Sequence, residues 1–193
     1  MIGIAGIARA GKDTLANCLK EIVEREFECD VEIIHLADKL KSDLDKVIAC
    51  NFYFQVHTDD TEQKNLIRPI LVAYGEAMKK KWGKEVWIKK LHEEIKARKD
   101  KKFYIIADVR FDFEVDYLFN NFKAETIHIR KTGNEAPNET EKLNDPLVRD
   151  KCDIKHQWPP YEPHEKEECK GHAEILWQMI PQEKKDIWLK TLN

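Results

Sequence analysis

The sequence lacks any long apolar run. No stretch approaches the roughly 18 apolar residues that a membrane-spanning helix needs, and Arg9 and Lys12 interrupt the first apolar run too early for a secretory signal peptide. The five cysteines are odd in number and widely spaced, which is unlike a disulfide framework. We therefore expect a soluble, reduced, cytoplasmic protein with no membrane partner.

An excess of positive charge is also lacking. The chain carries 33 basic and 36 acidic residues, for a net charge of −3. A protein that acts mainly by binding nucleic acid is usually basic overall, so we expect no nucleic-acid partner. Internal repeats and low-complexity tracts are lacking as well, and the length of 193 residues predicts one domain over 1–193.

Apolar strands alternate with amphipathic helices along most of the chain. This alternation predicts an α/β fold with a parallel sheet covered on both faces. The expected strands are 2–6, 31–36, 103–109, 124–130 and a short edge strand at 153–158. The expected helices are 12–27, 38–49, 61–83, 84–98 and 111–122.

The last third of the chain is less regular. Residues 131–151 are polar and poor in apolar residues, which predicts a loop, and a long loop in a compact domain favours a functional lid. The PPYEP segment (159–163) predicts a turn or linker, and a helical extension is expected over about 165–193. Pro69 is expected to start or kink a helix, because proline lacks the N–H donor.

The stretch GIARAGKDT, residues 6–14, closely matches a phosphate-binding loop, G-x-x-x-x-G-K followed by Ser or Thr. It follows an apolar strand and opens a helix, where successive backbone N–H groups form a concavity for phosphate oxygens. Lys12 is placed to reach the transferred phosphate. The alternative is a chance glycine-rich turn before a helix. The predicted ligand-binding residues of this loop are Gly6, Arg9, Ala10, Gly11, Lys12, Asp13 and Thr14.

The hydroxyl that normally follows the lysine comes one residue late, at Thr14. In a P-loop hydrolase this hydroxyl ligates Mg²⁺ directly, whereas here Asp13 takes its place in the sequence. Asp13 is expected to hold a metal-bound water and Thr14 an inner phosphate, although a helix N-terminus also favours Asp13 electrostatically. Monophosphate kinases that read G-K-G-T share the later hydroxyl, so the pattern favours a small-molecule kinase over a hydrolase or switch.

Charged residues lie at the end of the third expected strand and just after the second and third. The carboxyl ends of strands line the ligand crevice of open α/β sheets, so Asp108 is a candidate for the Mg²⁺ shell. Arg110 is a candidate phosphate clamp, with an ion pair to Glu114 as the alternative. Asp38 is a candidate helix N-cap, and Lys41 a candidate contact for an acceptor phosphate.

Cysteine and histidine residues recur between Cys152 and His172. The group comprises Cys152, His156, His164, Cys169 and His172. Its spacing matches no zinc pattern, so we expect no metal there.

Four motifs together resemble the phage-type deoxynucleoside monophosphate kinases. They are GKDT in the loop, LADKLK after the second strand, RPILVAYGE with WGKEVW in the middle, and ADVRFDFE at the third strand. The resemblance spans about 2–130. The animal-type phosphomevalonate kinases share a similar GKD loop and are the alternative. A P-loop ATPase or nucleotide switch is disfavoured, because N-K-x-D and switch-like D-x-x-G motifs are lacking.

The resemblance implies a three-layer P-loop kinase sandwich with about five parallel strands. It also implies transfer of the γ-phosphoryl group of ATP, with Mg²⁺, to a deoxynucleoside monophosphate, in the host cytoplasm if the chain is viral. The loop takes ATP; Lys12, Arg110 and Arg130 are implied to be catalytic, and Asp13, Thr14 and Asp108 to serve the metal. The implied substrate-binding residues are Asp38, Lys41, Arg68, Asp108, Arg110 and Glu141, the last from a lid signature that NETE (138–141) keeps in part. The base and the oligomeric state, monomer or homodimer, stay open.

Overall fold

The computed structural model describes residues 1–98, 100–159 and 166–192. By compactness the chain divides into two units, which are described separately. Unit 1 is formed by Met1–Ile34 together with Asp100–Asn193, and unit 2 by His35–Lys99. Among the described residues, none of the helices combines the length and apolar character needed to cross a bilayer.

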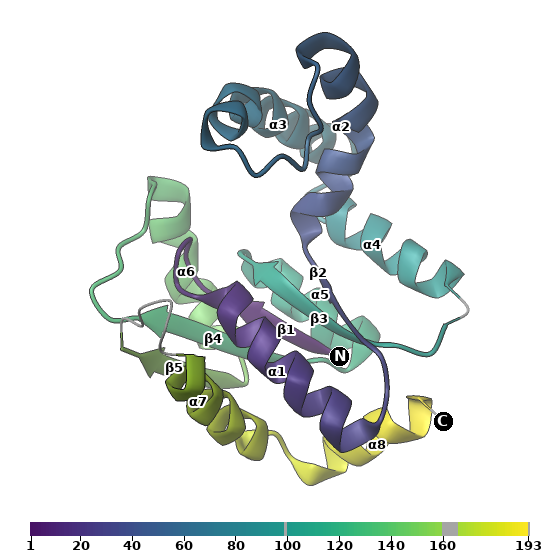
Figure 1. The fold of residues 1–193 in the computed structure, drawn as a ribbon, viewed down its shortest axis with the longest axis vertical. Coiled ribbons are helices and arrows are strands. Elements are labelled where there is room, and N and C mark those ends of the chain that lie inside the picture. Colours follow the sequence, from purple (N-terminus) through teal and green to yellow (C-terminus); the bar gives the residue numbers. More distant parts are fainter. Residues whose placement is uncertain (99, 160–165, 193) are drawn as a thin grey trace. The chain divides into compact units, whose positions relative to one another are not determined.

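Unit 1 is built on a five-stranded sheet, and all of its strand pairs are parallel (Figure 1). The strand order is β2-β3-β1-β4-β5. The strands are β1 (Ile2–Ala5), β2 (Val31–Ile34), β3 (Phe103–Val109), β4 (Glu125–Lys131) and β5 (Ile154–Trp158). β1 lies at the centre of the sheet and β5 at its edge, which confirms the expected sheet. The phosphate loop, which follows β1, therefore starts at the middle of the sheet.

One face of the sheet is covered by α1 (Lys12–Phe27), α7 (Lys166–Met179) and α8 (Gln182–Leu192). Alternate strand residues such as Ile4, Ile105 and Ile127 are fully buried against these helices. Since side chains alternate across a strand, the intervening residues face the other layer. The C-terminal segment is helical in both α7 and α8, and Pro181 directly precedes α8.

The other face carries α5 (Asp112–Phe122) and α6 (Glu139–Lys151). A Cβ built on Gly3 would lie 2.8 Å from Leu118 Cδ1, so the glycine lets α5 approach β1 closely. The sheet is therefore covered on both faces, and the predicted three-layer α/β sandwich is confirmed.

The described residues of unit 2 form three helices, which are α2 (Leu36–Phe52), α3 (Thr61–Trp82) and α4 (Val86–Ala97). A small apolar core of Ile48, Val56 and Ile67 joins α2, the following loop and α3. Gly75 on α3 allows close contact, because a Cβ there would lie 2.8 Å from Leu40 Cδ1. The helix runs through Pro69, which lies inside a helix of 22 residues, so a new start at this proline is wrong. The kink expected as the other possibility stays a prediction.

The loop predicted over 131–151 is wrong in its second half, which forms α6. Asn138 caps this helix by accepting a hydrogen bond from Glu141 N at 2.8 Å. Val148 is the buried apolar residue of α6, whereas Leu143 and Leu147 are exposed, so the segment has no apolar periodicity to reveal it. Most of the PPYEP turn, and His164, lie outside the described residues.

Candidate active site

The loop between β1 and α1 depends on glycine at both ends. Gly6 has φ 141° and Gly11 has φ 90°, in the region that side chains disfavour. A Cβ on Gly6 would lie 2.4 Å from Ile129 O, and one on Gly11 would lie 2.3 Å from Trp158 Cζ2. Arg9 is also left-handed, at φ 63°. This path brings the loop's backbone to the start of α1, as a phosphate-binding loop requires.

Lys12 is the first residue of α1 and its side chain is buried. Its Nζ donates to Gly6 O and Ile7 O, both at 2.8 Å. An ammonium has three N–H donors, so the two carbonyls fix the group in place and leave a third donor for a ligand. Burial lowers the pKa of Lys12, and the positive charge of Arg110 lowers it further. The negative charge of a bound phosphate would oppose both effects.

Arg110 follows β3, as predicted, but its guanidinium does not pair with Glu114. Arg110 Nη1 donates to Glu141 Oε1 at 2.6 Å. The other oxygen, Glu141 Oε2, accepts the backbone N–H of Ala8 in the loop, also at 2.6 Å. The structure thus brings Arg110, Glu141 and the phosphate loop together.

Glu114, in the first turn of α5, holds the backbone that carries Arg110. Its Oε2 accepts the N–H groups of Arg110 at 2.8 Å and Phe111 at 3.0 Å. Burial raises the pKa of this carboxyl to about 7, against the effect of the two hydrogen bonds. The sequence did not predict this positioning role; it suggested Glu114 only as an alternative ion-pair partner of Arg110.

The segment after β4 lies over the loop. Asn134 Nδ2 donates to Ala8 O at 2.9 Å. A cleft of about 660 Å³ is lined by Ile7 of the loop, by Arg130 at the end of β4, and by Lys142 of α6. Asp145 of α6, which also lines this cleft, bonds through Oδ1 to Nε2 of the buried His128 ring at 2.8 Å. Arg130, which lines this cleft, is exposed.

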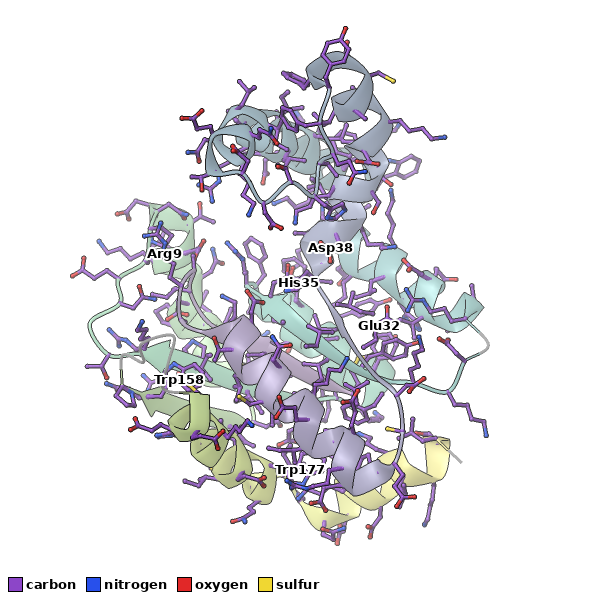
Figure 2. The ribbon with its side chains drawn as sticks, in the orientation of Figure 1. Arg9, Glu32, His35, Asp38, Trp158 and Trp177 are labelled. Atoms are coloured by element: carbon purple, nitrogen blue, oxygen red, sulfur yellow. The ribbon has the colours of Figure 1, made fainter. Side chains whose placement is uncertain are left out.

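Trp158, labelled in Figure 2, lies at the end of β5 and contacts the last part of the loop. Its Nε1 donates to Ala10 O at 2.8 Å, and the ring is buried. A hollow of about 70 Å³ lies beside it, lined in part by Arg9, Thr14 and Cys169. Sequence reasoning missed Trp158, although its place at the carboxyl end of a parallel strand was a signal.

The residues expected to serve Mg²⁺ supply suitable oxygen donors. Asp13 and Thr14 are exposed at the start of α1, and Asp108 is half-buried near the end of β3. Both carboxylates lie near enough to the Lys12 ammonium to raise its pKa. No group of three His, Cys, Asp or Glu side chains within the described ranges could hold a metal alone. This donor set fits Mg²⁺, which proteins commonly bind through one or two carboxylates plus substrate phosphates.

Asp38, Lys41 and Arg68 all belong to unit 2. Asp38 is not an N-cap: His35 caps α2, which begins two residues before Asp38. Asp38 instead lies 3.4 Å from Lys41 Nζ and 3.5 Å from His35 Nδ1. Burial opposes its ionisation, but these partners and His57 outweigh burial and lower the pKa of Asp38 to about 2. Arg68 is exposed on α3.

The cysteine and histidine residues after β4 form no metal cluster within the described part of the chain. His156 and His172 bond to one another, Nε2 to Nδ1, at 2.8 Å. Burial lowers the pKa of His156, and the neighbouring His172 adds to this effect.

Comparison with known proteins gives a family match over a segment that includes this loop. The profile of the phosphomevalonate kinase family matches residues 4–124, from β1 through α5 and over more than half of the chain. A search of curated proteins finds no significant match. The family matched is the alternative of the sequence analysis rather than its main interpretation. The chain belongs to the phosphomevalonate kinase family, and is therefore an ATP-dependent kinase.

Proposed function

We propose that this chain transfers the γ-phosphoryl group of ATP to the phosphate of a small phosphorylated acceptor, with phosphomevalonate as the first candidate. The family match supports the candidate acceptor. The observation that carries the proposal is the cluster of Lys12, Arg110 and the loop backbone around one anion-binding position.

Phosphoryl transfer needs positioning and charge neutralisation more than covalent chemistry. The loop's N–H groups hold the ATP phosphates, and Lys12 donates to an oxygen of the transferred group. Arg110 adds a planar fork suited to phosphate oxygens. Mg²⁺, when bound with ATP, would neutralise phosphate charge, and Asp13, Thr14 and Asp108 are the residues that would hold it.

The acceptor needs no strong general base, because its nucleophile is already a phosphate oxygen. Lys41 and Arg68 are the cations of unit 2 that we assign to the acceptor, with Asp38 fixing Lys41. The segment after β4 serves as a lid that excludes water, which would otherwise hydrolyse ATP.

Deoxynucleoside monophosphates are the second candidate acceptors. The LADKLK, RPILVAYGE and ADVRFDFE motifs favour them. Both candidates present a phosphate to the enzyme and differ in the rest of the molecule.

A panel of acceptors tests the proposal. ADP release would be followed with ATP and Mg²⁺ alone, and after adding phosphomevalonate or each of the four deoxynucleoside monophosphates. We expect ADP formation that depends on one acceptor class, with phosphomevalonate the best. A preference for one monophosphate would assign the second candidate, and acceptor-independent ADP release would indicate an ATPase and contradict both.

A further inference from the structure

We propose that the Glu141 carboxylate is an internal anion of the phosphate site: it occupies donors that a ligand phosphate needs, and an incoming phosphate displaces it and frees Arg110. This inference rests on the proposed use of ATP at the loop. It gives α6 a regulatory role in addition to its part in the lid.

The contacts of Glu141 are those that a phosphate would make. Its two oxygens accept one loop N–H, from Ala8, and one guanidinium N–H, from Arg110, each at 2.6 Å. Backbone N–H groups and arginine are the donors that proteins use for phosphate oxygens. The Glu141 side chain is only 10 % exposed, so it fills this position rather than lying beside it in solvent.

The charges around Glu141 explain why the position is filled. Lys12 and Arg110 repel each other, and this repulsion contributes to the lowered pKa of Lys12. The negative charge of Glu141 opposes it, and raises the pKa of Lys12. Without a bound phosphate, Glu141 supplies the negative charge that this cluster needs; with a phosphate present, two anions would compete for the same donors.

The fold allows Glu141 to leave without unfolding α6. Glu141 lies in the first turn, next to the Asn138 cap, and its carboxylate holds this turn to the loop. The segment before the helix is held to the loop by Asn134, which donates to Ala8 O. The body of the helix is attached separately, through Asp145 to His128 and through the buried Val148. The first turn is therefore the part that ligand binding can release.

Isothermal titration calorimetry with inorganic tripolyphosphate and with ATP tests the inference. The variants are Glu141→Gln and the matched control Glu139→Gln, which removes the same charge from an exposed side chain of the same turn. If Glu141 competes with the ligand, its neutralisation raises the fraction of binding-competent protein. We expect Glu141→Gln to bind tripolyphosphate roughly tenfold more tightly than wild type, and Glu139→Gln to bind like wild type.

The outcomes separate this inference from the proposed function. If wild type binds ATP and Glu141→Gln binds it equally well or more weakly, this inference alone is overturned. Glu141 would then be a ligand-binding or structural residue. No binding of either probe to wild type or variant overturns both proposals. If Glu141→Gln fails to fold, Glu141→Asp replaces it. The shorter side chain cannot reach Ala8 and Arg110 together, so we expect Glu141→Asp to bind tripolyphosphate more tightly than wild type, but by less than about tenfold.

Discussion

The ring of Trp158 lies where any side chain on Gly11 would have to be. A Cβ on Gly11 would lie 2.3 Å from Trp158 Cζ2, and the indole N–H donates to the neighbouring Ala10 O at 2.8 Å. The end of β5 thus fixes the last turn of the phosphate loop, 148 positions earlier in the chain. The contact ties the loop's shape to the packing of the sheet.

Gly11→Ala should therefore damage both stability and ligand binding. The added methyl group meets an aromatic ring, and φ 90° is unfavourable for alanine. We expect a loss of about 3 kcal/mol in the free energy of unfolding, measured by urea denaturation, and ATP binding too weak to detect by calorimetry. Gly171→Ala is the control: this exposed helical glycine has open space around it, and the change should be neutral or stabilising. Equal stability of the two variants would contradict both the Trp158 contact and the left-handed backbone at Gly11.

Glu114 should make stability depend on pH. Its pKa is 4.5 in the unfolded chain and about 7 in the fold. Below pH 4.5 both states are protonated; as the pH rises to 7, the unfolded state ionises first, and wild type loses stability. Relative to Glu114→Gln, wild type should lose about 3 kcal/mol between pH 4 and pH 8. Urea denaturation across this range measures the difference. For the exposed control Glu139→Gln, the difference from wild type in the free energy of unfolding should not vary with pH. If the difference for Glu114→Gln also does not vary with pH, Glu114 is not buried as a neutral acid.

Asp13 and Thr14 should differ in their effect on Mg²⁺. A carboxylate that acts through a water contributes charge without strict geometry, so Asp13→Asn should raise the Mg²⁺ concentration for half-maximal rate several-fold. Thr14→Ala should weaken ATP binding and leave the Mg²⁺ requirement nearly unchanged. The measurement is rate against Mg²⁺ at saturating ATP. The reverse pattern would assign the metal contact to Thr14.

Arg68 should serve the acceptor and not ATP. Arg68→Ala is expected to raise the KM for the acceptor by about tenfold or more, because a charged hydrogen bond contributes about 1.5–3 kcal/mol. The Kd for ATP alone should stay within about twofold of wild type. Lys64→Ala, also on an exposed part of α3, provides a control for loss of charge. If Arg68→Ala weakens ATP binding and acceptor binding equally, Arg68 does not serve the acceptor alone.

The loop and the sheet could be predicted because their signals are local or periodic. The order Gly6, Gly11, Lys12 lies within one short stretch, and the fully buried residues of β3 form a continuous apolar run. Helix α6 could not be found by periodicity, since Val148 is its buried residue. An Asn with Glu three residues later, Asn138 and Glu141, was the capping signal that could have revealed it.

The partners of charged residues could not be predicted in the same way. Glu141 contacts Ala8 across 133 positions and Arg110 across 31, and no local pattern encodes such pairs. Glu114 stands four residues after Arg110, a spacing that suggests a side-chain ion pair. The structure uses the backbone N–H of Arg110 instead, because Arg110 precedes the helix and its N–H lies at the helix start.

The central claim is tested most directly by measuring acceptor-dependent ADP formation. The proteins compared are wild type, Lys12→Ala and the control Lys20→Ala. Lys20 lies on the same helix and pairs with Glu24 outside the loop. Lys12→Ala should fold with a melting temperature within a few degrees of wild type, because the loss of two hydrogen bonds is offset by removal of a buried charge that Arg110 repels. Its turnover should fall about a hundred- to a thousandfold, as for loss of a donor to a reacting oxygen, while Lys20→Ala stays near wild type. Near-normal turnover by a folded Lys12→Ala protein would contradict the account, because phosphoryl transfer would then occur elsewhere than at this loop.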